Sequence, residues 1–273
     1  MDRLLEQLKD YLTKLAPGGL CVAFSGGVDS SLLLKLACMA ADDVHAVTAC
    51  TPFHTAAEPR EAGEAAAAYG AVHHLLTPQL PRAVMDNPPE RCYLCKKALF
   101  GEILRYAGGQ SLAHILDGTN ADDLKEYRPG IQALKELGVH SPLAELGITK
   151  SQVRELAARL GLTVAEKPSA PCLATRFPYN QPVNPFYFAG IDRIERQVRG
   201  LGIPVVRARV EGAALRLEVP LEDFAALLPH RKALVRAALD AGFAGVSLDL
   251  EGFRSGSMDI REARLTHERS NPK

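Results

Sequence analysis

The sequence predicts an α/β protein in which a doubly wound, mainly parallel sheet is followed by a smaller α+β C-terminal domain. Through residues 1–167, apolar runs of strand length alternate with helical patterns, which is typical of a parallel sheet covered on both faces. Five prolines between Pro168 and Pro185 then interrupt the alternation. We therefore expect three parts: an α/β domain over 1–167, a cysteine-bearing loop or linker over 168–185, and an α+β domain over 186–273.

The elements of the first part follow one another in a regular order. Leucines at helical spacing predict a helix over 2–16, which Pro17-Gly18-Gly19 ends. The later elements are expected as strands over 20–24, 44–51, 72–76 and 114–117, as a helix after residue 31, and as helices over 56–69 and 98–107.

The chain beyond residue 185 has a different pattern. The expected elements are a helix over 186–201, strands over 205–210 and 215–219, a helical stretch over 221–241, and a last strand over 246–250. Two strands, a helical stretch and a strand behind a leading helix indicate an α+β unit of about 85 residues, within the usual domain range. The charged tail after Asp259 is expected to fray.

Composition excludes several classes of protein. The 32 basic and 32 acidic side chains of the 273-residue chain give a formal net charge of zero, which argues against binding long nucleic acid by bulk charge. No apolar run approaches the ~20 residues of a membrane span, and the first residues form an amphipathic helix pattern rather than a signal peptide. Six cysteines without a secretory signal indicate reduced thiols. We expect a cytoplasmic protein with no membrane partner and no nucleic-acid partner.

A candidate phosphate site follows the first expected strand. Two adjacent glycines let the backbone approach an anion, and the free N–H groups of the following helix point at it. The pattern is neither of the two common glycine-rich phosphate motifs. An acidic residue is unexpected there unless it holds Mg²⁺ or the loop geometry; the alternative interpretation is a tight turn with an N-capping side chain. The candidate ligands are Ser25, Gly26, Gly27, Asp29, Ser30 and Ser31.

The motif Ser-Gly-Gly-Val-Asp-Ser resembles the pyrophosphate loop (PP-loop) of the N-type ATP pyrophosphatases, which have an adenine nucleotide alpha hydrolase-like fold. Those enzymes cleave ATP between the α and β phosphates and transfer AMP to a carbonyl or carboxylate oxygen. Further stretches over 87–97, 117–123 and 167–176, with the ending over 250–256, resemble the LarE family. The resemblance spans almost the whole chain.

The resemblance to the LarE family implies an ATP-dependent sulfur transferase. Such a protein adenylates a carboxylate of pyridinium biscarboxylic acid mononucleotide and replaces AMP with sulfur to give a thiocarboxylate. The product serves the nickel-pincer nucleotide cofactor of lactate racemase. The resemblance also implies a homo-oligomer, a sulfur donor as a partner, and a role of the C-terminal domain in substrate binding or oligomerisation.

Three cysteines form a candidate sulfur centre. Cys92 and Cys95 form a Cys-x-x-Cys, and Cys172 lies in the proline-rich segment. Three thiolates that hold a [4Fe–4S] cluster leave one iron open for an extra sulfide, as the resemblance to the cluster-bearing branch implies. Two alternatives stay open: a redox dithiol, and the single-cysteine branch, in which the matching cysteine gives up its sulfur and becomes dehydroalanine. The remaining cysteines are expected to be small buried hydrophobes: Cys21, Cys38 and Cys50.

Polar residues after the fourth strand and in the C-terminal part complete the candidates. Asn120 and Asp123 lie where open α/β sheets place their ligand crevice, and the resemblance assigns this stretch to ATP and metal; a polar loop is the alternative. Arg207 and Arg209 share one strand face and are expected to bind the substrate's nucleotide phosphate, unless that face is only solvated. For the same pocket we expect Arg176 and Glu195.

Three rival functions remain at this stage. A tRNA thiolase also joins a PP-loop to a three-cysteine cluster, but zero net charge and 6% aromatic residues argue against RNA binding. A regulator would bind ATP without turnover and would not need the cysteines. A zinc-stabilised amide synthetase is a more remote option.

Overall fold

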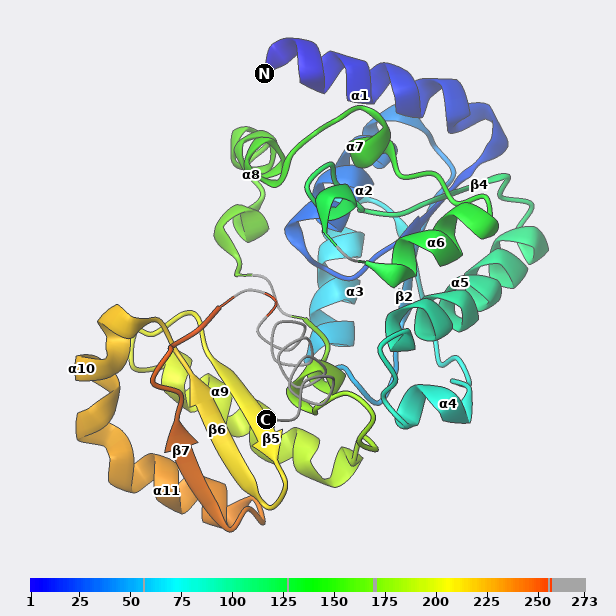
Figure 1. The fold of residues 1–273 in the computed structure, drawn as a ribbon. Helices are drawn as coiled ribbons and strands as arrows, with labels where there is room; N and C mark the ends of the chain where they lie inside the picture. The colour runs from blue at the N-terminus through cyan, green and yellow to red at the C-terminus, as the bar shows by residue number, and fades with distance from the viewer. Residues whose placement is uncertain (56, 127, 169–170, 255, 257–273) are drawn as a thin grey trace, which may run out of the picture. The chain divides into compact units, whose positions relative to one another are not determined.

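The computed structural model describes residues 1–55, 57–126, 128–168, 171–254 and 256 (Figure 1). The chain divides into two compact units: residues 1–84 with 90–169, and residues 85–89 with 170–273. The expected tail after Asp259, and parts of two quoted stretches, lie outside the described residues: Ser169, Ala170 and Ser255.

The first unit is built on a parallel four-stranded sheet of order β3-β2-β1-β4. Its strands are β1 (Leu20–Ala23), β2 (Val44–Ala49), β3 (Val72–Leu76) and β4 (His114–Leu116). Its helices are α1 (Asp2–Leu15), α2 (Val28–Ala40), α3 (Glu58–Tyr69), α4 (Arg82–Met85), α5 (Arg91–Gly109), α6 (Pro129–Glu136), α7 (Pro142–Glu145) and α8 (Lys150–Arg159).

Helices cover both faces of this sheet, as the α/β prediction requires (Figure 1). Successive side chains of a strand point to opposite faces. Leu20 and Val22 of β1 therefore pack into a core shared with α1, α2, α3 and α8, whereas Cys21 between them packs into a second core with α5 and α6. The predicted doubly wound sheet is confirmed.

Several helices differ from the sequence expectation. The helix expected over 98–107 begins seven positions earlier, as α5 at Arg91, and ends at Gly109. The sequence pattern did not predict helices α4, α6, α7 and α8. Helix α8 begins at a capping box between Thr149 and Gln152. The start expected at residue 56 lies outside the described residues, and α3 begins at Glu58.

The second unit is an α+β structure around a three-stranded sheet of order β5-β6-β7, in which β5 pairs antiparallel and β7 parallel with β6 (Figure 1). Its elements are α9 (Phe188–Arg199), β5 (Arg207–Glu211), β6 (Ala214–Glu218), α10 (Phe224–Leu227), α11 (Arg231–Asp240) and β7 (Gly245–Leu248).

The segment expected as a separate linker over 168–185 is divided differently in the structure. From residue 171 onward it packs into the second unit, together with residues 85–89. The Asn87 side-chain amide donates to the carbonyl of Phe177 at 3.0 Å, and the Val183 N–H donates to the Met85 carbonyl at 2.7 Å. Residues 85–89 thus bond to residues 177–183 of the second unit, a contact that the sequence pattern does not reveal.

None of the helices in the described ranges has both the length and the apolar character that a membrane span requires.

Candidate active site

The phosphate-loop candidate joins β1 to α2 at the carboxyl edge of the sheet. Gly26 has φ of 69°, which favours glycine, and Gly27 is the N-cap of α2. The Ser30 hydroxyl donates to the Gly27 carbonyl at 3.1 Å and lies 3.2 Å from the Ser25 hydroxyl. These hydrogen bonds fix the conformation of the loop at the N-terminal end of α2, where an anion would be stabilised.

Ser31 does not share this position. Its side chain is fully buried, and its hydroxyl forms no hydrogen bond among the described residues. Its N–H is used by the first helical bond to Gly27, at 2.9 Å. Nothing here supports Ser31 as a phosphate ligand, in contrast to Ser25 and Ser30, which line the neighbouring cavity.

Asp29, the unexpected carboxylate of the loop, is paired with a lysine. The Lys150 ammonium forms an ion pair with one carboxylate oxygen, and the Asn120 side-chain amide donates to the other at 3.2 Å. The Lys150 N–H in turn donates to the Asp122 side chain at 2.9 Å. The start of α8 is thereby bonded to both the phosphate loop and the loop after β4.

The loop after β4 is held by its own carboxylates. Buried Asp117 accepts from the Thr119 hydroxyl at 2.7 Å and forms an ion pair with Lys96 at 3.5 Å. Asp123 accepts from the Asn120 N–H at 3.0 Å and pairs with an arginine on the following segment. These contacts bring Asn120 and Asp123, both predicted site residues, next to the phosphate loop.

A cavity of about 300 Å³ lies beside the two loops. Its lining includes polar residues, among them Ser25, Asp29 and Asp123, and apolar residues such as Phe100 of α5. A lining with both apolar and hydrogen-bonding groups suits a ligand that carries a flat base and phosphates. The cavity therefore fits a nucleotide.

His54 also lines this cavity and was not predicted from the sequence. The Thr51 N–H donates to its Nδ1 at 3.1 Å, so this nitrogen is the acceptor. Burial lowers the pKa of His54, and the negative charge of Glu58 opposes this effect in part. The neutral ring therefore carries its proton on Nε2.

The three candidate sulfur-centre cysteines are divided between the two units. Cys92 and Cys95 lie in the first turn of α5; Cys92 is exposed, and the buried Arg91 guanidinium lies 3.7 Å from its sulfur. Cys172 is half-buried in the second unit. No group of three or more His, Cys, Asp or Glu side chains arranged to hold a metal ion is found in the described parts of the chain. The three-thiolate site stays a prediction.

The other cysteines are only partly as expected. Cys21 is fully buried in β1, and burial raises the pKa of its thiol to about 12. Cys38 and Cys50 are half-buried rather than buried, and burial raises the pKa of each thiol. These thiols behave as packing groups.

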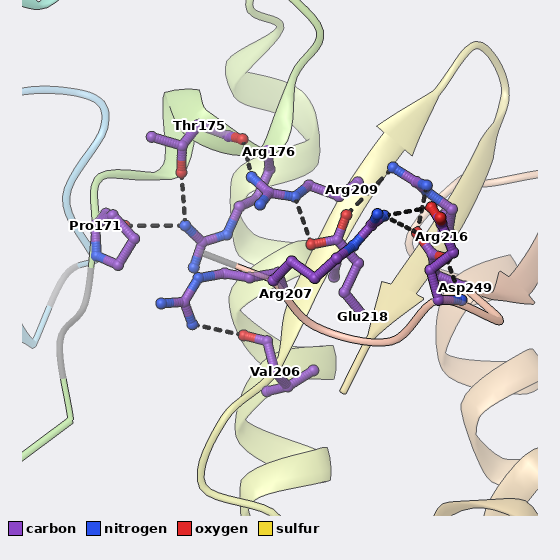
Figure 2. A network of polar contacts seen from close by, with 12 residues as sticks. Pro171, Thr175, Arg176, Val206, Arg207, Arg209, Arg216, Glu218 and Asp249 are labelled. Atoms are coloured by element: carbon purple, nitrogen blue, oxygen red, sulfur yellow. Dashed lines mark hydrogen bonds and ion pairs between the residues drawn. The ribbon is translucent and has the colours of Figure 1, made fainter. Parts of the chain in front are cut away.

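The second unit holds a buried network of polar contacts that includes Arg176, Arg207 and Arg209 (Figure 2), and Glu195, the fourth residue predicted there, forms a buried ion pair with Arg176. The Arg176 guanidinium binds both carboxylate oxygens of Glu195, at 2.7 and 2.8 Å, and donates to the Thr175 hydroxyl at 2.8 Å. Glu195 also accepts from Arg199 at 2.8 Å and from the Ala208 N–H of β5 at 3.0 Å. Burial would raise the pKa of Glu195, but these hydrogen bonds and charges hold it below its usual value.

Arg209 pairs with a second buried carboxylate, that of Glu218. It donates to Glu218 of β6 at 3.1 Å and to the Thr175 carbonyl. Glu218 is fully buried and also accepts from Arg216 at 3.2 Å, which in turn pairs with Asp249 (Figure 2). Two buried carboxylates, Glu195 and Glu218, therefore fix the arginines of the cluster.

Arg207 is the most strongly perturbed cation of the cluster. It donates to the Val206 carbonyl at 2.8 Å (Figure 2). Its guanidinium lies 5.3 Å from the centroid of the Phe253 ring. Its pKa is lowered to about 10, first by burial and then by the positive charges of Arg176 and Arg209. The negative charge of Glu195 acts in the opposite direction. A buried site in which guanidinium groups repel one another attracts an anion. The prediction of a phosphate at this face keeps its physical support.

Four residues important to this geometry were not predicted from the sequence. Lys96, Lys150, Arg216 and Glu218 carry no local motif of their own. The strand register offers a partial signal for two of them, because Arg216 lies opposite Arg209 in the antiparallel pair and Glu218 lies opposite Arg207.

A family model and several known proteins are similar to this chain. A family model described as asparagine synthase matches residues 4–102, the region of the phosphate loop. An uncharacterized protein of Synechocystis (slr1717) is 37% identical over 264 residues, which cover 95% of this chain and 98% of that protein. The pyridinium-3,5-bisthiocarboxylic acid mononucleotide synthase of Lactiplantibacillus plantarum is 36% identical over 242 residues, which cover 87% of this chain and 88% of that enzyme. The tRNA-specific 2-thiouridylase MnmA of Trichlorobacter lovleyi matches only in part, at 30% identity over 54% of this chain and 51% of that protein.

The parallel sheet, the glycine-rich loop at its carboxyl edge and the nucleotide-sized cavity, together with the match to the asparagine synthase model, define an ATP pyrophosphatase of the PP-loop type. The similarity to the Lactiplantibacillus enzyme runs through both units and narrows the class. The chain belongs to the LarE family. It is an ATP-using sulfurtransferase.

Proposed function

We propose that this protein adenylates a carboxylate of pyridinium biscarboxylic acid mononucleotide and then replaces AMP with sulfur to give a thiocarboxylate. This reaction would contribute to nickel-pincer cofactor biosynthesis. The observation that carries the proposal is the 36% identity to the Lactiplantibacillus synthase over 87% of this chain. The reaction needs a site for ATP, a site for an anionic mononucleotide and a source of sulfur.

The first unit supplies the ATP site. The backbone of Gly26 and Gly27 and the hydroxyls of Ser25 and Ser30 face the position of a phosphate at the start of α2. The apolar residues of the cavity lining, among them Phe100, would accommodate the adenine base of ATP. Holding the triphosphate in this way places the α-phosphorus for attack by a carboxylate and lets pyrophosphate leave.

Two carboxylates that line the cavity fit Mg²⁺. Asp29 and Asp123 line the cavity, and carboxylate oxygens are the ligands that Mg²⁺ prefers. When bound, Mg²⁺ would neutralise phosphate charge during pyrophosphate release. Asn120 bonds to both carboxyl-bearing residues and keeps them in place.

The second unit supplies the mononucleotide site. Arg207 and Arg209 share one face of β5, both are buried, and burial together with neighbouring guanidinium groups lowers the pKa of each. A phosphate beside them would form charge-assisted hydrogen bonds in a region of low dielectric. Arg176 and Glu195 position this face rather than contact the ligand, because they bind each other through two hydrogen bonds and their remaining groups bond to Thr175, Arg199 and Ala208.

The cysteines have the donor type that an iron–sulfur cluster needs. Cys92 and Cys95 lie in the same helical turn, and Cys172 would supply the third thiolate. A [4Fe–4S] cluster held in this way would supply the sulfide that displaces AMP. The alternative, Cys172 as a sacrificial donor, leaves Cys92 and Cys95 without a role in sulfur transfer.

The test is turnover by the full chain with ATP and pyridinium biscarboxylic acid mononucleotide. We expect stoichiometric pyrophosphate and AMP, and a product in which mass spectrometry finds an oxygen replaced by sulfur. If pyrophosphate appears only with tRNA, and binding to tRNA falls steeply with salt, the protein is a tRNA thiolase. If ATP binds without any pyrophosphate release, it is a regulator.

The sulfur source needs a separate measurement. Iron and acid-labile sulfide should be present in anaerobically prepared protein and absent after Cys92→Ala and Cys95→Ala together, with Cys38→Ala as the control. If neither preparation holds iron, the cluster is wrong, and the mass of Cys172 after one turnover tests the sacrificial route. The predicted homo-oligomer, sulfur donor and cytoplasmic location stay predictions.

A further inference from the structure

We propose that His54 and Glu58 form the specificity-determining pair for adenine in the ATP site. His54 donates from Nε2 to a ring nitrogen of the base, and Glu58 accepts a hydrogen bond from the amino group beside that nitrogen. The inference deepens the proposed function and rests on it, because it requires ATP in the cavity of the first unit.

The His54 ring is fixed by the turn that follows β2. The Thr51 N–H donates to its Nδ1 at 3.1 Å, and the Thr51 hydroxyl lies 3.2 Å from the same nitrogen. The Phe53 N–H donates to that hydroxyl at 3.3 Å, and the Phe53 side chain is buried. With Nδ1 engaged as an acceptor, the proton of the neutral ring lies on Nε2, for which no partner is found among the described residues. Because His54 lines the cavity, this N–H is the donor that it offers to a ligand.

Glu58 supplies an acceptor close to this donor. It lies in the first turn of α3 and lines the same cavity. The Thr55 N–H and the Thr55 hydroxyl both donate to its Oε1, each at 2.9 Å, so these contacts leave Oε2 to a ligand. The negative charge of Glu58 raises the pKa of His54 against the effect of burial, which requires the two side chains to be near each other.

The chemistry of this pair fits a base and not the phosphates. A carboxylate repels phosphate oxygens. A neutral N–H and a carboxylate oxygen, by contrast, match an acceptor and a donor on one edge of a ring, and adenine has such an edge, because its amino group donates and the adjacent ring nitrogen accepts. Apolar residues of the lining, among them Val47 and Ala49 of β2, provide a surface for the flat faces of the base. Hypoxanthine and guanine carry an oxygen in place of the amino group, and Glu58 would repel it.

The first experiment needs only the full-length wild type. Calorimetry measures its affinity for ATP, for inosine triphosphate, for purine riboside triphosphate, which lacks the amino group, and for 1-deaza-ATP and 7-deaza-ATP, which each lack one ring nitrogen. We expect inosine and purine riboside triphosphates to bind about tenfold or more weakly than ATP, and one of the two deaza analogues to bind about tenfold more weakly. Equal affinities for ATP and all four analogues overturn the inference and leave the proposed function intact.

The second experiment compares two variants with matched controls. His54→Phe keeps a ring but removes the donor, so it should bind ATP about tenfold more weakly and should no longer distinguish ATP from the deaza analogue that the wild type disfavours. Glu58→Gln keeps an oxygen for Thr55 and can place an NH₂ group at the position of Oε2, so it should weaken ATP and strengthen inosine triphosphate. His74→Phe, outside the cavity lining, and Glu64→Gln, on the surface of α3, should match the wild type.

Three results would overturn the inference. The first is wild-type affinity for ATP in His54→Phe, and the second is an unchanged ratio of ATP to inosine triphosphate affinity in Glu58→Gln. The third is a wild type that binds 2′-deoxy-ATP more weakly than ATP but binds both deaza analogues as tightly, since the pair would then contact the ribose. A wild-type protein that binds neither ATP nor pyrophosphate overturns the proposed function and this inference together.

Discussion

Replacing Glu195 by glutamine is expected to lower the free energy of unfolding by about 3–5 kcal/mol, because the change breaks a buried ion pair from one side. Glu195 is 1% exposed and accepts four hydrogen bonds, two of them from Arg176. The glutamine oxygen can still accept from two donors. Its NH₂ group would face the remaining donors, and each lost hydrogen bond to a charged group costs about 1.5–3 kcal/mol.

The measurement is urea unfolding of the full chain at neutral pH, with Glu64→Gln as the matched control. Glu64 pairs with Arg60 at 2.8 Å, a similar distance, but on the surface, where both side chains are more than 60% exposed. Its loss should cost no more than about 1 kcal/mol. A loss below about 1 kcal/mol for Glu195→Gln would refute the claim that Glu195 organises the arginine cluster.

The same variant predicts a pH dependence with a definite sign. The pKa of Glu195 is lowered in the folded protein, so its ionised form stabilises the fold above its ordinary value of 4.5. This contribution is lost as the pH falls through the folded-state pKa. The difference in stability between wild type and Glu195→Gln should therefore shrink in acid, and a difference that grows there would contradict the assignment.

Two further predictions concern the first unit. Gly118→Ala places a Cβ 3.0 Å from the Ser30 backbone nitrogen, so it should distort the phosphate loop and weaken ATP binding about tenfold or more, as calorimetry would show; Gly101→Ala, with nothing within 4 Å, should leave affinity unchanged. Alkylation by iodoacetamide at about pH 8, followed by mass spectrometry, should label exposed Cys92 and spare Cys21, whose thiol pKa is raised to about 12. Labelling of Cys21 as fast as Cys92 in folded protein would show that the β1 core opens.

The fold of the first unit could be predicted from the sequence because its signals are local. The apolar run at Leu20, the glycines at Gly26 and Gly27, and the helix that follows are contiguous, and each obeys a short-range rule. The alternation of strands and helices then predicts that the strands run parallel, whereas their order in the sheet comes from the structure. The sequence also predicted that Asn120 and Asp123 follow a strand at the edge that carries the phosphate loop, and the structure brings Asn120 to Asp29; their role in binding ATP stays a prediction.

The partners of those residues could not be predicted, because their contacts join distant parts of the chain. Lys150 lies 121 positions from Asp29, and nothing in its neighbourhood distinguishes it from other lysines at helix starts. Arg176 and Glu195 were predicted for one pocket, but their bidentate pairing depends on how α9 packs on β5. A pattern of residue types gives the composition of a site, whereas the pairing of its charges requires the tertiary structure.

Both candidate sites keep their cations beside carboxylates, and this has a consequence for how each binds phosphate. In the first unit Asp29 holds Lys150, and in the second Glu195 and Glu218 hold the arginines. Buried cations without such partners would repel one another and destabilise the free protein. A phosphate therefore enters a site whose charges are already fixed in place, and it gains affinity from orientation as much as from net charge. We accordingly expect binding of the mononucleotide to depend on salt far less than binding of a nucleic acid would.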